Sequence, residues 1–220
     1  MRFLGLNPET VAARSRGVTP LPIQTTPIRS TLFGALMFGS VSVFVFGLWA
    51  GTGPALYRIG GELGAYLVWA AAFMVLAGLG LGRLVVGRDN RLRFLACFAL
   101  AFAAYSAVWM AAWFAFRNRT GEVAGAMGGT AVFAWVICQA FGAPKQWSDT
   151  ALYLFIGNTV GYFSGDLAHQ RLGGDSGKIA WGLLYGLGFG AGIGASLHAV
   201  QADIRRRLQP EAAETPDAAH

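Results

Sequence analysis

Six stretches of the sequence are long and apolar enough to cross a lipid bilayer. A helix rises about 1.5 Å per residue, so about 20 apolar residues span the roughly 30 Å hydrocarbon core. Backbone polar groups in that core must bond within the chain, and runs of this length do so as helices rather than as barrel strands. We therefore expect an all-α fold, a polytopic membrane helical bundle. Its six transmembrane helices are expected at Thr31–Gly51, Leu63–Gly82, Arg93–Ala115, Glu122–Gly142, Thr150–Ala168 and Lys178–Val200.

Composition agrees with a membrane protein. Hydrophobic residues make up 55% of the 220 residues and charged residues only 13%, whereas soluble chains carry about 25% charged residues. The low charge also excludes a chain that is disordered throughout. The fifth apolar run is the weakest of the six, because Asn158, Ser164 and Asp166 interrupt it.

The basic residues between the apolar runs predict the orientation. Arginines concentrate before the first run, between the second and third runs, and after the sixth run at Arg205–Arg207. Lys and Arg are enriched in cytoplasmic loops, so both termini are expected in the cytoplasm, the N-in/C-in arrangement. We expect a multi-pass protein of the bacterial inner (cytoplasmic) membrane. This bias accounts for the net charge of +6, so no nucleic-acid partner is expected.

The two ends of the chain differ from its apolar middle. Residues 1–30 contain arginines and Pro20, Pro22 and Pro27, which favours an extended cytoplasmic arm. Residues 31–200 form the expected six-helix transmembrane domain. Residues 201–220 begin basic and end acidic, and we expect a disordered cytoplasmic tail there.

The positions of the tryptophans agree with the expected helices and with their orientation. Five of the seven fall in the outer halves of the expected helices, the depth at which amphipathic indole rings settle. Trp135 lies deeper and is expected to pack between helices. The five outer residues are Trp49, Trp69, Trp109, Trp113 and Trp181.

Glycines recur every fourth residue in the last three apolar runs. Such a series forms a groove along one helix face, where a second backbone can approach closely and be held by dispersion and weak Cα–H···O contacts. We expect these faces to pack helices of this chain, with a second copy or another subunit as the alternative occupant. The three series are Gly121, Gly125 and Gly129; Gly157, Gly161 and Gly165; and Gly182, Gly186, Gly190 and Gly194.

A line of polar residues runs along one face of the fifth expected helix. Asn158, Tyr162, Asp166 and His169 follow one another at helical spacing. A carboxylate facing lipid is costly, so this face is expected to turn toward the bundle interior or a wet cavity. Asn158 lies near mid-membrane, the depth of many transporter binding sites. The alternative is that Asn158 bonds a neighbouring helix, while Asp166 and His169 lie at the outer interface and pair with Arg171.

No motif of a known catalytic site is present. The sequence contains no H-E-x-x-H, no G-x-S-x-G and no P-loop. His169 and His198 are expected at opposite membrane depths, which excludes a bis-histidine haem within one chain. Cys97 and Cys138 are expected to be buried free thiols. We therefore expect no enzyme activity, no bound metal and no cofactor.

Two functional hypotheses follow from these patterns. The first is a small transporter, channel or membrane-embedded transporter subunit whose solute path is lined by the polar face of the fifth helix. The second is a non-catalytic accessory or assembly subunit that docks into a larger membrane complex through its glycine-rich helix faces. The expected surroundings are the lipid bilayer, and the candidate partners are a small-molecule solute and a homo-oligomer or larger membrane complex.

Overall fold

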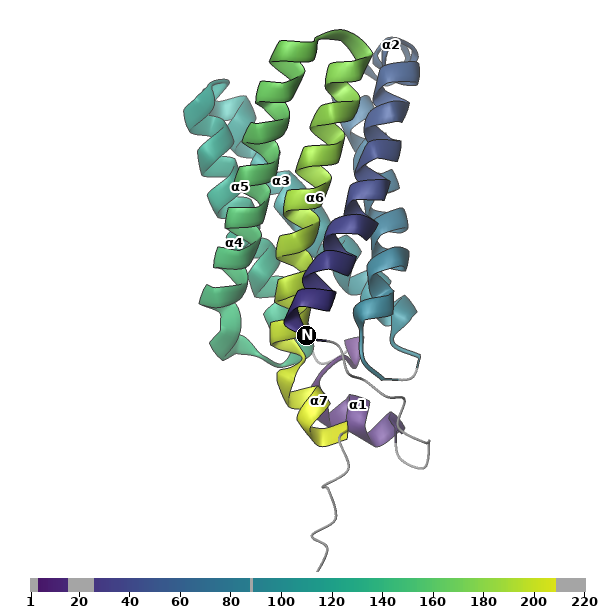
Figure 1. Cartoon of the computed structure of the whole chain (residues 1–220), viewed down its shortest axis with the longest axis vertical. Coiled ribbons are helices and arrows are strands. Elements are labelled where there is room, and N and C mark those ends of the chain that lie inside the picture. Colours follow the sequence, from purple (N-terminus) through teal and green to yellow (C-terminus); the bar gives the residue numbers. More distant parts are fainter. Residues whose placement is uncertain (1–3, 16–25, 88, 209–220) are drawn as a thin grey trace, which may run out of the picture.

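The computed structural model describes residues 4–15, 26–87 and 89–208, and the expected all-α fold is confirmed for this part of the chain (Figure 1). Of these residues 92% are helical, and none forms a strand. The elements are α1 (Pro8–Ser15), α2 (Pro27–Leu81), the 3-10 helix η2 (Gly82–Leu84), α3 (Arg91–Phe116), α4 (Arg119–Phe141), the 3-10 helix η3 (Pro144–Gln146), α5 (Trp147–Leu172), α6 (Gly174–Val200) and α7 (Ala202–Leu208).

Helix α2 is folded back on itself at Gly61. The backbone of Gly61 has φ 64° and ψ −168°, outside the helical region, and glycine adopts a positive φ at little cost. Rings on either side of the break meet across the fold: the centroids of Phe38 and Phe73 are 5.3 Å apart, and those of Trp49 and Trp69 are 5.9 Å apart. The helix therefore has two antiparallel arms, which we call the first arm (27–60) and the second arm (62–81).

Within the described ranges, four helices are long and apolar enough to cross a membrane. Helix α5 does not meet the same requirement, because polar residues such as Asn158 and Asp166 reduce its apolarity. The four candidates are Pro27–Leu84, Arg91–Phe116, Arg119–Phe141 and Gly174–Val200.

Helix α6 packs between the first arm of α2 and α5 (Figure 1). A Cβ atom added at Gly186 would lie 2.7 Å from the Cα of Gly39 in the first arm. One added at Gly188 would lie 2.5 Å from the carbonyl oxygen of Gly157 in α5. Real side chains do not approach this closely, so both interfaces bring backbone against backbone. Each of the ten glycines in the three series contacts a neighbouring helix of this chain.

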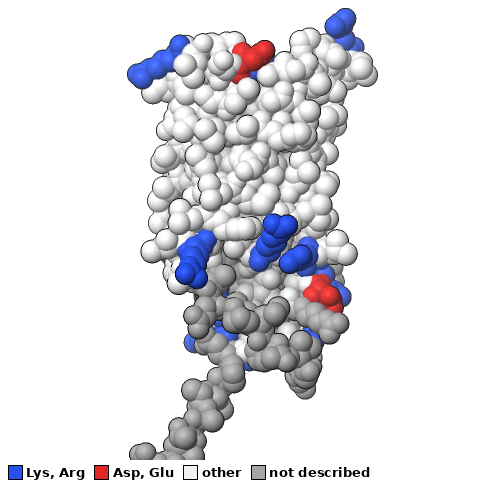
Figure 2. Space-filling view, turned by 45° about the vertical axis from the view of Figure 1, so that its right-hand side comes forward, with Lys and Arg blue, Asp and Glu red and all other residues white. Residues whose placement is uncertain are grey.

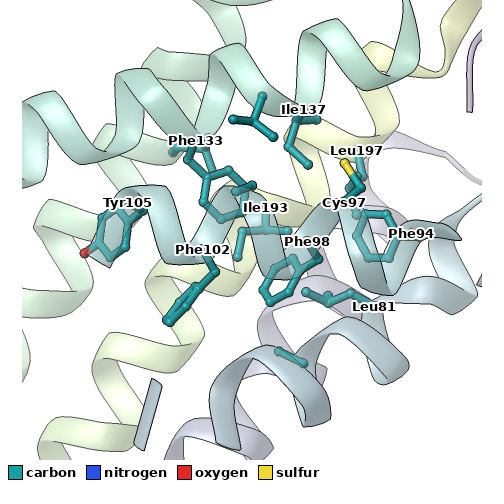
Figure 3. Close-up of a cluster of buried hydrophobic side chains, with 14 of the residues drawn as sticks. Leu81, Phe94, Cys97, Phe98, Phe102, Tyr105, Phe133, Ile137, Ile193 and Leu197 are labelled. Atoms are coloured by element: carbon teal, nitrogen blue, oxygen red, sulfur yellow. The ribbon is translucent and has the colours of Figure 1, made fainter. Parts of the chain in front are cut away.

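Aromatic and aliphatic side chains fill the space between α3, α4 and α6 (Figure 3). Phe98 lies 5.8 Å from Phe133 and 5.8 Å from Phe102, measured between ring centroids. Phe133 in turn packs edge-to-face on Phe189 of α6. This closely packed region lies nearer the α1–α7 end of the bundle, and Phe102 and Tyr105 continue it toward the other end.

Two short segments form helices within the ranges where we expected an extended arm and a disordered tail. Residues 8–15 fold as α1 and residues 202–208 as α7, and the two helices pack together (Figure 1). Leu6, Val11 and Ile204 are almost completely buried there. Short helices of this length are unstable alone, and it is the mutual burial that stabilises them. The expected tail beyond residue 208 lies outside the described residues.

Gln201 fixes the turn between η2 and α3 to the end of α6. Its side-chain oxygen accepts a hydrogen bond of 2.7 Å from the backbone N–H of Val86, and its side-chain nitrogen donates to the carbonyl oxygen of Leu84 at 3.2 Å. Gln201 is only 1% exposed, and a buried amide is costly unless it is bonded in this way. The C-terminal end of α6 is thereby held against the chain segment that joins α2 to α3.

The outer surface is apolar between two charged ends. On the face shown in Figure 2, Lys, Arg, Asp and Glu occur at both ends of the bundle but not across its middle. Trp135, which we expected between helices, lies on this kind of outer surface with half of its area exposed. Its helix α4 packs inward through glycines and phenylalanines instead, which leaves the bulky indole on the other side.

Adding one methyl group at the α2–α6 contact should destabilise the bundle. In Gly186→Ala the new Cβ would lie 2.5 Å from the Cβ of Ser42, and overpacking of this kind costs about 1–3 kcal/mol. Gly51→Ala is the matched control, because a Cβ there meets nothing within 4 Å and alanine favours a helix. Thermal unfolding in detergent should show a lower midpoint for Gly186→Ala and an unchanged or higher one for Gly51→Ala. Equal midpoints would contradict the close backbone contact.

Candidate functional site

A cavity of about 330 Å³ lies in the half of the bundle opposite α1 and α7. It is a partly open cavity lined by residues of both arms of α2 and of α3, α4, α5 and α6. Thirteen of its 18 lining residues are aromatic. The lining residues are Val45, Phe46, Trp49, Tyr57, Tyr66, Trp69, Ala70, Phe73, Phe102, Tyr105, Ser106, Trp109, Met110, Trp113, Glu122, Tyr162, Trp181 and Tyr185.

The walls of the cavity are rings that pack on one another. Tyr57 and Tyr66 both lie edge-on to Trp69, each with its ring centroid 5.8 Å away. On the opposite side Tyr162 packs against Trp181 at 5.4 Å. Contacts of this type hold each ring in a fixed orientation. The cavity is therefore built into the packing of the bundle.

Glu122 is the only charged residue among those lining residues, all of which belong to the described part of the chain. Its side chain is only 16% exposed. One carboxylate oxygen accepts a hydrogen bond of 3.2 Å from the hydroxyl of Tyr162, and the other accepts one of 2.8 Å from the guanidinium of Arg119. Arg119 also pairs with Asp166 at 3.2 Å. One guanidinium is thus shared between two carboxylates at the edge of the cavity.

The polar line of α5 lies against the other helices. Asn158 is 1% exposed, and its side-chain oxygen accepts a hydrogen bond of 2.9 Å from the hydroxyl of Tyr105. This is the neighbouring-helix bond that the alternative interpretation describes. Asn158 does not line the cavity, but its partner Tyr105 does. Of the four residues on this face, Tyr162 alone lines the cavity.

Asp166 and His169 lie further along α5, beyond the cavity lining. Asp166 accepts hydrogen bonds from Arg119 of α4 and from Gln170 at 3.0 Å. The alternative interpretation paired it with Arg171, and no such ion pair is present among the described residues. His169 stacks on Trp181, with ring centroids 5.5 Å apart and planes inclined by 27°. It therefore supports one ring of the cavity wall from behind.

The five tryptophans that we expected in the outer halves of the helices all line the cavity. Trp69 is only 8% exposed, and the other four are partly buried. Rings of an interfacial belt contact lipid headgroups, whereas each of these rings borders the cavity on at least one side. The role of Glu122 was also missed, since in the sequence it marks only the start of an apolar run. The signal that could have found the site is the concentration of Trp and Tyr at one depth in five helical segments.

Other polar clusters do not form a metal site. Among the described residues no group of three or more His, Cys, Asp and Glu side chains could hold a metal ion. Cys97 and Cys138 are free and buried, as we expected. His198 lies at the α7 end of α6, where its ring nitrogens are 3.5 Å from the Ser30 hydroxyl and 3.2 Å from the Arg205 guanidinium.

Comparison with known proteins does not identify a relative. No protein family matches this sequence, and neither does any curated protein or solved structure.

Removing the buried hydroxyl of Tyr105 should weaken the bundle. In Tyr105→Phe the amide oxygen of Asn158 loses its donor, and an unsatisfied buried group costs about 1–3 kcal/mol. Asn158→Leu removes the amide as well, so the double variant should be more stable than the sum of the two single effects indicates. A double-mutant cycle from unfolding in detergent measures this coupling. Strict additivity of the two substitutions would show that the hydrogen bond contributes nothing.

Proposed function

We propose that this chain is a small integral membrane transporter, channel or transporter subunit, and that its solute binds in the aromatic cavity. The observation that supports this function is a preformed cavity of about 330 Å³ inside a bundle of apolar helices. Ligand sites typically have volumes of about 300–1,000 Å³ and combine apolar walls with a few placed polar groups. Ser106, Glu122 and the tyrosine hydroxyls are such groups here.

The path of the chain supports six crossings. The first candidate helix, Pro27–Leu84, has 58 residues, which would be about 87 Å long if straight and nearly three times the bilayer core. Its reversal at Gly61 makes two crossings of suitable length. Helix α5 connects the end of α4 to the start of α6 and packs beside both. If α4 and α6 cross in the same direction, α5 must cross between them.

The position of the ends supports an N-in/C-in arrangement. Helices α1 and α7 are in contact, so the described ends of the chain lie on the same side, as an even number of crossings requires. The arginine-rich segment Arg205–Arg207 is at this end, and basic residues favour the cytoplasmic side. The cavity then lies in the outer half of a bacterial inner-membrane protein.

The polar face of α5 supplies the proposed route to the cavity. Asp166 and His169 lie between the outer end of α5 and Tyr162, and Asn158 lies beyond Tyr162 toward the middle of the helix. A solute from the outer side would pass the Arg119, Asp166 and Glu122 cluster before reaching the rings. Movement of α6 against its neighbours at the glycine contacts would then open the cavity inward.

The accessory-subunit hypothesis is less well supported. It requires glycine-rich faces that are free to dock a partner. Each of the ten glycines on those faces is covered by another helix of this chain. Docking into a larger complex or a homo-oligomer would need a different surface, such as the outer side of α4 with Trp135.

The proposed topology can be tested with single cysteines and a membrane-impermeant maleimide. Arg58, Lys145 and Arg171 are exposed, and each lies close to a reversal of the chain between proposed crossings. Cysteines at 58 and 171 should react in intact spheroplasts, and a cysteine at 145 only after lysis. The wild type is the control, since its two native cysteines are buried. Labelling of 145 and 171 from the same side would show that α5 does not cross.

Filling the cavity should abolish solute uptake. Ser106→Trp places a large ring in the space that Ser106 lines, and Ala107→Trp, at an exposed position of the same helix turn, is the matched control. Vesicles containing each variant would be incubated with a mixture of small metabolites, and the retained compounds identified by mass spectrometry. We expect at least one compound to accumulate about ten-fold less in Ser106→Trp than in the wild type and in Ala107→Trp. Identical retention in all three would rule out the cavity as the site.

A further inference from the structure

We propose that the cavity takes an organic cation, namely a small molecule with an alkylated ammonium group. This inference rests on the proposed function, because it names the class of solute that the cavity binds. Trp, Tyr and Phe rings attract cations through their negative faces, and aromatic cages of this kind recognise quaternary ammonium groups.

The types of ring in the cavity favour a cation over a neutral apolar molecule. The chain has 7 Trp, 6 Tyr and 16 Phe, and the cavity uses five of the Trp and five of the Tyr but only three of the Phe. Half of the twelve largest fully buried side chains are phenylalanines, and none of the twelve is a Trp or a Tyr. A purely apolar site could be lined by Phe equally well. Trp binds cations best among the three rings, so the distribution fits a charged ligand.

The interior position of these rings excludes a simple membrane-interface explanation. Trp and Tyr are enriched at bilayer interfaces, but there their rings contact headgroups. Trp69, Tyr105 and Tyr185 are all less than 10% exposed and line the cavity from within. These three rings therefore border the cavity from inside the bundle and do not contact lipid headgroups.

The charges at the cavity edge add a negative excess. Arg119 is shared by Glu122 and Asp166, so one positive charge faces two negative charges. Both carboxylates are largely shielded, with 16% and 18% of their side chains exposed, whereas Arg119 is 59% exposed. The guanidinium is thus turned outward and Glu122 is the charge that lines the cavity. A cation inside the cavity would neutralise the one negative charge that Arg119 leaves uncompensated in the cluster of Arg119, Glu122 and Asp166.

Cations of the chain itself already use rings at this end of the bundle. The Lys178 ammonium lies 5.3 Å from the ring centroid of Trp49, which is a cavity residue. The Arg119 guanidinium lies 4.6 Å from the ring centroid of Phe163. Both distances fall within the approximately 6 Å range of a cation–π contact. The ring of Trp49 is thus already in contact with a cation of the chain, and the charge of Lys178 is itself paired with Asp175 at 3.0 Å.

Choline and its neutral isostere 3,3-dimethylbutan-1-ol form a matched probe pair, because a carbon atom replaces the charged nitrogen without a change of shape. Binding to the protein in lipid nanodiscs can be followed by tryptophan fluorescence, since five of the seven tryptophans line the cavity. We expect choline to bind the wild type at least about ten-fold more tightly than the isostere, a difference that cation–π contacts and one carboxylate can supply. Equal affinities, or no binding of choline, would overturn the inference.

Two Glu→Gln variants test whether the negative charge of Glu122 contributes to choline binding. Glu122→Gln keeps the side-chain volume and an acceptor for the Tyr162 hydroxyl, so it should weaken choline binding about ten-fold and leave the isostere unchanged. Glu62→Gln is the control, since Glu62 is exposed at the same end but does not line the cavity. Loss of choline binding in both variants to the same extent would overturn the assignment of Glu122. If Ser106→Trp abolishes uptake of some neutral metabolite while choline does not bind, the cavity remains a solute site and only the cation class is wrong.

Discussion

Helix α6 touches the first arm of α2 on one side and α5 on the other through backbone atoms, and the positions of the remaining helices depend on these contacts. Lipid tails are as apolar as leucine, so helices in a bilayer gain little from hiding apolar surface and must gain from close packing instead. Gly186 against Gly39 and Gly188 against Gly157 provide that closeness. A chain with larger residues at these positions could not bring three helices to such short separations.

The cavity follows from where this close packing stops. Toward the α7 end of α6, Gly194 meets the backbone of Ser30 and Thr31, and the helices are in contact. Toward the other end, Gly182 meets the ring of Phe46 in the first arm of α2, whereas α5 and α6 stay in backbone contact at Gly165 and Trp181. Large rings therefore separate α6 from the first arm of α2 at that end, and rings of fixed shape cannot fill all of the space between these helices. Close packing near the α1–α7 end and an open aromatic space near the other end both follow from this change in side-chain size between α2 and α6.

Much of the fold could be predicted from the sequence, because the length of an apolar run and the spacing of its glycines act locally. The direction in which a side chain points could not. Trp69 and Trp109 were placed at the right end of the bundle by their depth, yet depth is the same for a ring that faces lipid and for one that faces a cavity. The alternative interpretation paired Asp166 with Arg171 of the same helix, whereas its partner Arg119 comes from another helix. The short helices α1 and α7 were missed because each is stabilised by burial against the other and not by its own sequence.

Helix α5 shows how polar residues can be accommodated inside an otherwise apolar helical bundle. Its polar residues reduce its hydropathy, and on that criterion it differs from the four candidate helices. Three of those residues are nevertheless hydrogen-bonded inside the bundle: Asn158 to Tyr105, Tyr162 to Glu122 and Asp166 to Arg119. A polar group that is bonded within the protein does not meet lipid and does not incur the full cost of insertion. The lower apolarity of α5 is thus a consequence of its position between α4 and α6, where it can supply polar groups to the interior.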